Sequence, residues 1–390
     1  KKFREKSVGP SDIKSLKDIE KFPFTFPEDL RHSSYDFLCI SQRDVEKPVT
    51  FFSSGTTGIR KRIYFSRADI IKIMEFLPRG MNTVTDRDNG IIQILLPNSA
   101  GRGIGYLLAE SLKSFGMRAV ISDMGWPADK IIRSCLDEKP DVCFGDAGTI
   151  FRVTKEMAGK MDLSKLGVKV LFLTMSNVAR SMKEYLEKAW NCRVATHYGL
   201  TEMGWGLAVD CDSCDGYHYN ELDVIAEVVD PETGKVLPEG EEGELVFTSI
   251  GREAMPIIRF TSGDISSLSK GSCGSSLKLM GHIVRRTEGM YDLGDGRYIY
   301  PALLEEAIYS IQEVVDYKAS VKGRKLYIDL ETVDKAYYGR PEESVKKEAM
   351  ERLLAIDEIR NSQVELTVEL LENGSLKPFC HQKKRIEERR

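Results

Sequence analysis

Short apolar runs alternate with amphipathic segments between about residues 66 and 200. Runs rich in branched apolar residues predict buried strands, and apolar residues at helical spacing predict helices between them. We expect strands at Ile91–Leu96, Ala119–Ser122, Val142–Phe144, Val168–Thr174 and Val194–His197, and helices at Ile104–Phe115, Ala128–Glu138, Ile150–Met157 and Ser181–Trp190. Strands that alternate with helices favour an α/β fold with mostly parallel, helix-covered sheets.

The pattern changes after about residue 220. Three strand-like runs separated by turn residues predict a β subdomain at about 220–280. The following helical and strand-like segments predict a small α+β module. The strand-like runs are Val224–Val229, Glu244–Ser249 and Pro256–Phe260. We therefore expect a large N-terminal domain over residues 1–283 and a small C-terminal domain over residues 284–390.

Composition and charge narrow the class of protein. The 390 residues are 42% hydrophobic and 30% charged, which is typical of a globular protein with a sizeable core. A formal net charge of -4 gives no general attraction to nucleic acid or acidic membranes. The 8 scattered cysteines do not resemble the disulfide framework of a small secreted protein. We expect a cytoplasmic protein with reduced thiols that binds neither nucleic acid nor membrane.

The most informative segment is residues 53–61, which read Ser-Ser-Gly-Thr-Thr-Gly-Ile-Arg-Lys. Its glycines let backbone N–H groups approach an anion, its hydroxyls donate further hydrogen bonds, and its lysine supplies positive charge. The composition therefore fits a loop that cradles phosphate. The Walker spacing cannot be placed on it, and a flexible surface turn has a similar composition. On the residues alone, both interpretations stay open.

This loop resembles the phosphate-loop motif of the adenylate-forming superfamily, which includes acyl-CoA synthetases, peptide-synthesis adenylation domains and luciferases. The family pattern is Ser-Gly-Thr-Thr-Gly-x-Pro-Lys, and Arg60 stands here in place of the proline. The resemblance implies that the loop grips the β- and γ-phosphates of ATP. The residues expected to do so are Ser54, Gly55, Thr56, Thr57, Gly58 and Lys61.

A second motif begins at His197 and reads His-Tyr-Gly-Leu-Thr-Glu, similar to the family's Tyr-Gly-x-Thr-Glu. It follows a predicted strand, and ligands of open α/β sheets collect at the carboxyl ends of strands. The resemblance implies that Tyr198 and Gly199 belong to the adenine site and that Thr201 contacts the α-phosphate. Glu202 is expected to hold Mg²⁺, which prefers oxygen ligands. His197 could border the acyl pocket, although an ordinary histidine at a strand end fits equally well.

A third motif combines Gly-Glu-Leu at 243–245 with Arg-Phe-Thr-Ser-Gly-Asp at 259–264. It resembles the family's Gly-Glu-Leu and Tyr-Arg-Thr-Gly-Asp pair, which implies that Asp264 accepts hydrogen bonds from both ribose hydroxyls. The family's hinge pattern Gly-Arg-x-Asp is not kept, because His282 stands at the arginine position. Arg285 or Arg286 is expected to substitute for that arginine, and Arg285 is the candidate contact to the nucleotide.

Within the superfamily, the chain is most similar to phenylacetate–CoA ligases and deazaflavin-adenylating synthetases. The phrases that carry this likeness are Asp-Ile-Lys-Ser-Leu-Lys-Asp-Ile at 12–19, Arg-Glu-Ala-Met-Pro at 252–256 and Cys-Gly at 273–274. The family's catalytic lysine lies in Gly-Lys-x-x-Arg near the C-terminus. The tail offers Gln382 at the strict spacing and Lys383 one residue later, so Lys383 is the expected adenylation lysine. A solvated basic tail has the same composition.

A separate group of residues has the spacing of a metal site. Cys211 and Cys214 form a Cys-x2-Cys element, His218 follows, and Cys273 lies further along the chain. Four nitrogen and sulfur donors suit a closed, tetrahedral zinc site that supports the fold. Reduced thiols with a structural histidine are the alternative.

The resemblance implies a function. The enzyme would use ATP and Mg²⁺ to convert a small aryl or acyl carboxylic acid into an acyl-adenylate. It would then transfer the acyl group to coenzyme A as a thioester and release AMP. Catalysis would come from positioning and charge neutralisation, and the small domain would rotate for the second step. Two alternatives stay open: transfer to an amine or carrier protein, and a nucleotide-binding accessory protein whose catalysis has decayed. We expect a monomer or a homodimer.

Overall fold

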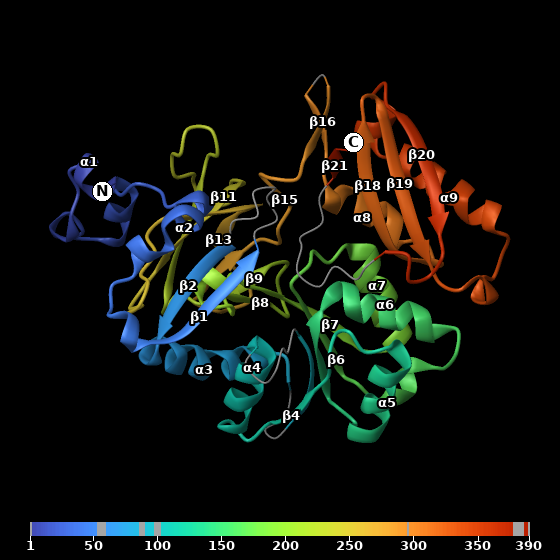
Figure 1. The fold of residues 1–390 in the computed structure, drawn as a ribbon, viewed down its shortest axis with the longest axis horizontal. Coiled ribbons are helices and arrows are strands. Elements are labelled where there is room, and N and C mark those ends of the chain that lie inside the picture. Colours follow the sequence, from blue (N-terminus) through green and yellow to red (C-terminus); the bar gives the residue numbers. More distant parts are fainter. Residues whose placement is uncertain are drawn as a thin grey trace. The chain divides into compact units, whose positions relative to one another are not determined.

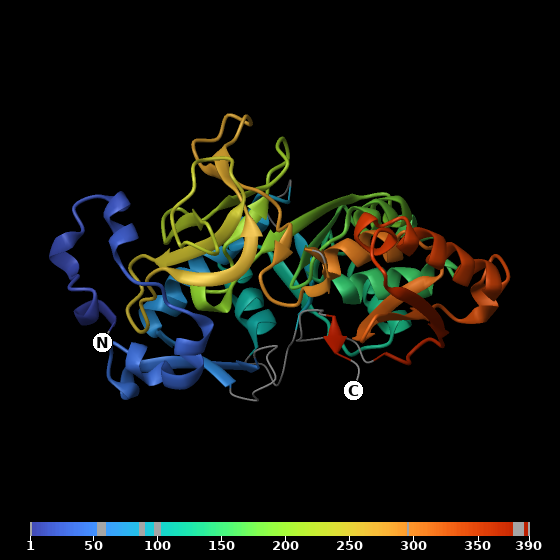
Figure 2. The same ribbon diagram turned by 90° about the horizontal axis from the view of Figure 1, so that it is seen from above.

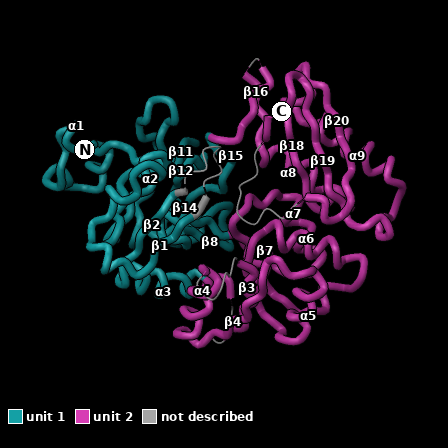
Figure 3. Tube along the Cα trace, in the orientation of Figure 1, with its two compact units in different colours: residues 1–80, 197–287 teal, residues 81–196, 288–390 magenta. Residues whose placement is uncertain are grey.

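The computed structural model describes residues 2–52, 60–85, 90–96, 103–294, 296–376 and 386–388. The chain divides into two compact units (Figure 3). Unit 1 comprises Lys1–Gly80 and His197–Thr287, and unit 2 comprises Met81–Thr196 and Glu288–Arg390. In these described ranges, no helix combines the length and the apolar character that a membrane span requires.

Unit 2 contains a parallel sheet with the strand order β7-β6-β5-β3-β4. Its strands are β3 (Ile91–Leu95), β4 (Arg118–Ile121), β5 (Val142–Asp146), β6 (Val170–Thr174) and β7 (Arg193–Tyr198). The accompanying helices are α4 (Ile104–Lys113), α5 (Ala128–Glu138), α6 (Ala147–Ala158) and α7 (Arg180–Trp190). Every residue of β5 and β6 is buried, as expected for strands covered on both faces. The predicted α/β class is confirmed.

The last part of unit 2 is an α+β arrangement around a second sheet, of order β20-β19-β18-β21. Its elements are β16 (Tyr291–Gly294), β17 (Arg297–Ile299), α8 (Pro301–Tyr309), β18 (Val314–Lys322), β19 (Lys325–Thr332), α9 (Glu342–Leu354), α10 (Asp357–Arg360), β20 (Glu365–Leu371) and β21 (Glu387–Glu388). Helices α8 and α9 contact each other, and contact β18 and β20 respectively (Figures 1 and 2). Their apolar core is continuous with that of α6, where the rings of Phe151 and Tyr309 lie 5.0 Å apart. The separate mobility expected of residues 284–390 stays a prediction.

Unit 1 is built mainly from antiparallel strands. One sheet has the order β10-β11-β12-β15, and a second set continues from the end of β7 in the order β8-β9-β14-β13. Its strands are β1 (Val45–Phe52), β2 (Arg60–Ser66), β8 (Ala208–Asp210), β9 (Tyr217–Tyr219), β10 (Val224–Val229), β11 (Gly243–Ser249), β12 (Phe260–Ser266), β13 (Leu268–Lys270), β14 (Lys278–Met280) and β15 (Arg285–Arg286), and its longer helices are α2 (Pro27–Ser33) and α3 (Arg67–Asn82). These strands agree with the β-rich character predicted near residues 220–280.

One strand prediction was displaced. The run 256–260 was expected to form a strand, but β12 begins only at Phe260. Proline at 256 has no backbone N–H for a sheet hydrogen bond, and Arg259 has a left-handed φ of 49°. Ile257 is instead fully buried in an irregular segment, where its carbonyl accepts the backbone N–H of Ser249 at 2.9 Å.

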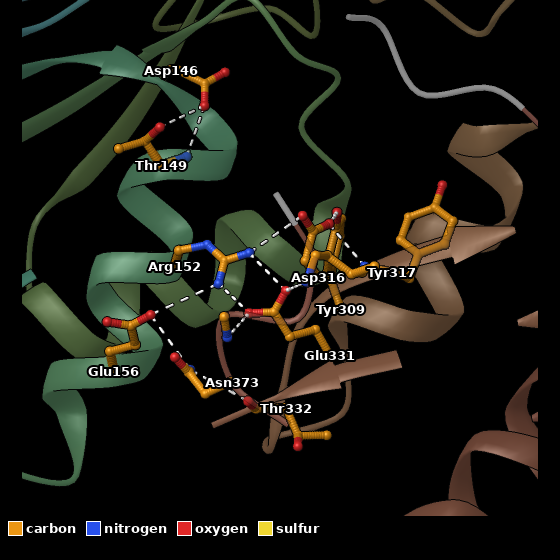
Figure 4. Close-up of polar contacts among 12 residues, drawn as sticks. Asp146, Thr149, Arg152, Glu156, Tyr309, Asp316, Tyr317, Glu331, Thr332 and Asn373 are labelled. Atoms are coloured by element: carbon orange, nitrogen blue, oxygen red, sulfur yellow. Dashed lines mark hydrogen bonds and ion pairs between the residues drawn. The ribbon is translucent and has the colours of Figure 1, made fainter. Parts of the chain in front are cut away.

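A charged network in unit 2 joins α6 to the second sheet (Figure 4). The guanidinium of Arg152 forms an ion pair with Glu331, and its Nη2 lies 3.5 Å from Oδ2 of Asp316. Glu331 is fully buried. Its Oε1 accepts the backbone N–H of Gly374 at 2.8 Å, and its Oε2 accepts that of Leu376 at 2.9 Å. A buried carboxylate is tolerated when it is paired and hydrogen-bonded in this way.

We expect Arg152→Ala to lower the free energy of unfolding by about 3–5 kcal/mol, because Glu331 would stay buried without its cation. Urea denaturation measures this loss. The control is Arg180→Ala, which removes an ion pair with Glu184 whose side chains are 85% and 62% exposed, and which should leave stability almost unchanged. Equal effects of the two substitutions would contradict this account of the network.

Candidate functional site

The carboxyl end of β7 carries a tyrosine that contacts an acidic residue of β12. Tyr198 is the last residue of β7, and its hydroxyl donates a hydrogen bond to Oδ2 of Asp264 at 2.7 Å. Arg286 on β15 pairs with Oδ1 of the same carboxylate. Asp264 is 2% exposed, so both of its oxygens are engaged inside the protein. The structure therefore brings together two residues that the sequence predicted for the adenosine part of the site.

The electrostatics of this group follow from burial. Burial, and next the negative charge of Asp264, raise the pKa of Tyr198 well above its usual value. The phenol therefore stays neutral and can donate its hydrogen bond to the carboxylate. The two arginines of β15 are distinguished by register, because Asp264 lies opposite Arg286, and Ile265 lies opposite Arg285. Neighbouring residues on a strand point to opposite faces, and it is Arg286 that contacts the carboxylate; the role of Arg285 stays a prediction.

A second buried pair joins β2 to the same motif. Lys61 forms an ion pair with Oε1 of Glu202, and the two side chains are only 10% and 5% exposed. The ammonium also lies 5.6 Å from the ring centroid of Phe260, within the range of a cation–π contact. The residue predicted to bind phosphate and the residue predicted to bind magnesium thus neutralise each other in this structure.

Arg252 completes the surroundings of Glu202, and the sequence did not single it out as a site residue. Its Nη1 donates to the backbone carbonyl of Glu202, and its guanidinium carbon lies 5.1 Å from the ring centroid of Phe65. Asp69, at the start of α3, accepts the backbone N–H groups of the two residues after Arg252 at 2.8 and 3.0 Å. The phrase Arg-Glu-Ala-Met-Pro supported the family resemblance. Only the fold shows that its arginine donates a hydrogen bond to the backbone carbonyl of Glu202.

The local structure shows the surroundings of the other residues of the second motif. A Cβ atom on Gly199 would lie 1.8 Å from the carbonyl oxygen of Trp205, so no larger residue fits. Thr201 begins a single 3-10 turn that also contains Glu202. Burial lowers the pKa of His197 to about 4. This histidine is therefore neutral at pH 7 and offers no positive charge to a substrate carboxylate.

The predicted metal ligands also come together. The Sγ atoms of Cys211, Cys214 and Cys273 all lie within 4.8 Å of one another. Nε2 of His218 lies 3.2 Å from Sγ of Cys273. The predicted phosphate-loop residues Ser54, Gly55, Thr56, Thr57 and Gly58, and the predicted adenylation lysine Lys383, lie outside the described residues.

Comparison with known proteins shows the family of this chain. The model of the AMP-binding enzyme family matches residues 42–252, which include Lys61 and the whole second motif. The chain belongs to the AMP-binding enzyme family. This membership confirms the predicted adenylate-forming superfamily.

Curated relatives support the closer likeness that was predicted from the sequence. A phenylacetate-coenzyme A ligase of Aromatoleum evansii is 31% identical over 316 residues, which cover 79% of this chain and 70% of the relative. A phenylacetate-coenzyme A ligase of Thermus thermophilus is 28% identical over 334 residues, which cover 83% of this chain and 73% of the relative. This member of the family is therefore close to the phenylacetate–CoA ligases.

Solved structures share the fold over the whole length of the chain. A 2-hydroxyisobutyryl-CoA ligase, in complex with an acyl-AMP in the postadenylation state, has a TM-score of 0.85 at 20% identity. The structural alignment covers 100% of this chain and 84% of the ligase. The same enzyme with its acyl-AMP and CoA in the thioesterification state has a TM-score of 0.69 at 22% identity. These similarities establish the fold of an adenylate-forming enzyme.

We expect the Lys61–Glu202 pair to show strong energetic coupling. Lys61→Met or Glu202→Gln alone should lower the free energy of unfolding by about 3–5 kcal/mol, because each leaves one buried charge without its partner. The double variant leaves no buried charge without a partner, so its loss should be smaller than the loss of either single variant. Urea denaturation of all four proteins measures this coupling.

The matched control is the exposed pair of Lys113 and Glu110, whose side chains are 64% and 36% exposed. Coupling between these two solvated charges should be close to zero. Additive losses at Lys61 and Glu202 would mean that the two charges are solvated in solution.

Proposed function

We propose that this protein is an AMP-forming acid–CoA ligase that activates a small carboxylic acid, aryl or acyl, as its acyl-adenylate. The observation that carries the proposal is the pair of buried charged groups around the second motif: Tyr198 and Arg286 on Asp264, and Lys61 on Glu202. They occur in a member of the AMP-binding enzyme family. Relatives named phenylacetate-coenzyme A ligase support the aryl acid and the thiol acceptor.

Asp264 is proposed to bind the ribose hydroxyls. Each carboxylate oxygen has two lone-pair directions, and each already accepts one strong hydrogen bond, from Tyr198 or from Arg286. One acceptor site on each oxygen is thus left for a ribose hydroxyl. Tyr198 and Arg286 would fix the orientation of the carboxylate before the nucleotide arrives, which lowers the entropy cost of binding. Arg285 is retained as a candidate contact to phosphate.

Lys61 and Glu202 are proposed to change partners when the nucleotide binds. Lys61 would turn toward the β- and γ-phosphates with Ser54, Gly55, Thr56, Thr57 and Gly58, and Glu202 would hold Mg²⁺. A carboxylate suits this hard cation, which would neutralise phosphate charge. Without nucleotide, the ion pair keeps both buried charges compensated, so the site need not stay open to water. Arg252 keeps the backbone of Glu202 in place during the exchange.

The reaction needs no nucleophile from the protein. An oxygen of the substrate carboxylate forms a bond to the α-phosphorus of ATP while the bond to pyrophosphate breaks, and Thr201 would bind the α-phosphate oxygen. The thiol of coenzyme A then attacks the acyl carbon, loses its proton, and AMP leaves. Positioning and charge neutralisation supply the rate enhancement. His197, neutral at pH 7, would border the acyl group without pairing with a charge.

The remaining expectations complete the proposal. Residues 284–390 are proposed to act as the small mobile domain, with Lys383 reaching the α-phosphate during adenylation only. The enzyme would work in the cytoplasm on small molecules, as a monomer or a homodimer, without nucleic acid or membrane partners.

An ATP–pyrophosphate exchange assay over a panel of acids tests the function. Arylacetic, benzoic, hydroxy and straight-chain aliphatic acids would be compared at equal concentration, with and without coenzyme A. We expect exchange with at least one small acid in the absence of coenzyme A, and formation of AMP and a thioester when it is added. Exchange without thioester formation would indicate an amine or carrier-protein acceptor. Absence of exchange with every acid would contradict an active adenylating enzyme.

A second experiment tests the role of Lys383. Lys383→Ala should reduce acyl-adenylate formation by at least ~100-fold, since a positioned charge on the transferring phosphoryl group contributes at this scale. Transfer of a presynthesised acyl-adenylate to coenzyme A should change less than about 5-fold, because the family's second step uses another domain orientation. Lys384→Ala is the matched control, and equal small losses in both variants would mean that the tail is merely basic and solvated.

A further inference from the structure

Two chain segments of unit 1 bring sulfur atoms to one place. Cys211 and Cys214 lie in the connection between β8 and β9, and Cys273 lies in the connection between β13 and β14. Strands β9 and β14 are hydrogen-bonded neighbours, in which His218 is opposite Leu279. The sheet therefore holds together residues that are about 60 positions apart in the sequence.

The interatomic distances suit one tetrahedral ion. Zinc–sulfur bonds of about 2.3 Å at tetrahedral angles place two sulfur atoms roughly 3.8 Å apart. The Sγ atoms of Cys211, Cys214 and Cys273 are mutually within 4.8 Å, so only a small contraction is needed. A nitrogen and a sulfur on the same ion would lie roughly 3.5 Å apart. Nε2 of His218 and Sγ of Cys273 are 3.2 Å apart.

A hydrogen bond at the other ring nitrogen prepares His218 as a ligand. Nδ1 of His218 lies 3.2 Å from the backbone carbonyl oxygen of Lys278. A carbonyl only accepts, so Nδ1 carries the hydrogen, and in the neutral ring Nε2 then has a free lone pair next to Sγ of Cys273. Metal-bound histidines in proteins usually have such a carbonyl or carboxylate partner on their other nitrogen. The backbone N–H of Ser213 also points at Sγ of Cys211, at 3.4 Å.

The geometry points to a structural zinc site formed by Cys211, Cys214, Cys273 and His218. Three thiolates and one imidazole select zinc over magnesium or calcium, which prefer oxygen ligands. Four protein ligands close the coordination sphere and leave no position for a substrate. The cysteines are partly exposed, so the ion can enter the folded protein.

The zinc ion cross-links a part of unit 1 that lies next to Tyr198. Tyr217 precedes the ligand His218 on β9, and its ring centroid lies 6.4 Å from that of Tyr198. Strands β8, β9, β13 and β14 have only three residues each, so few backbone hydrogen bonds hold them. A metal cross-link between their connections supplies the stability that such short strands lack.

Metal analysis of the full-length protein, purified without chelator or polyhistidine tag, tests the site. We expect about one zinc per chain in wild type and less than about 0.1 in Cys211→Ser, Cys214→Ser and Cys273→Ser. Cys39→Ser is the matched control, because Cys39 is exposed and outside the cluster, and it should keep the full zinc content. Zinc that is absent from wild type, or unchanged in the cluster variants, would overturn the proposal.

Wild-type protein provides a second test that does not depend on the folding of variants. After removal of the metal with a chelator, added zinc should protect Cys211, Cys214 and Cys273, but not Cys39, from alkylation. Cobalt(II) in place of zinc should give the strong visible absorption of a tetrahedral thiolate site. Alkylation of all four thiols in the presence of zinc, or a disulfide within the cluster, would contradict the assignment. The adenylation activity is not needed for any of these measurements.

Discussion

A buried carboxylate must have positive charge or hydrogen-bond donors next to it, and this constraint organises the polar structure of both units. Glu202 has Lys61, Asp264 has Arg286 and the hydroxyl of Tyr198, and Glu331 has Arg152. Leaving any of these carboxylates unpaired would cost several kcal/mol, on the order of half of a typical domain's stability. The backbone segments that carry them are therefore fixed with respect to their partners within each unit.

The sequence predicted the parts of the fold that depend on local pattern. The strands of the parallel sheet follow from short apolar runs, and the helices between them from apolar spacing, with most boundaries within three residues. The second motif was correctly placed at the end of a strand, because its first two residues, His197 and Tyr198, are the last two of β7. Strand β12 was displaced, since nothing in the apolar character of Ile257 and Ile258 reveals the left-handed φ of Arg259.

The contacts that the sequence could not reveal join distant parts of the chain. Arg152 and Glu331 are 179 positions apart, and neither belongs to a recognisable motif. Arg286 was one of two adjacent arginines, and only the register of β15 against β12 places it on Asp264. The pairing of Lys61 with Glu202 was also hidden, because each residue was assigned to a ligand and not to the other. Such partner choices depend on three-dimensional packing, which spacing alone does not encode.

The partners of Glu331 differ in how they would behave during a domain rotation. The backbone N–H groups of Gly374 and Leu376 belong to residues 284–390 and would travel with this carboxylate, whereas Arg152 lies on α6. Of the partners of Glu331, a turn of residues 284–390 away from residues 1–283 would therefore detach only the guanidinium. Glu331 would pass through an intermediate state with two hydrogen bonds and no cation. Removing the cation from a buried carboxylate costs free energy, so the Arg152–Glu331 ion pair would oppose such a rotation.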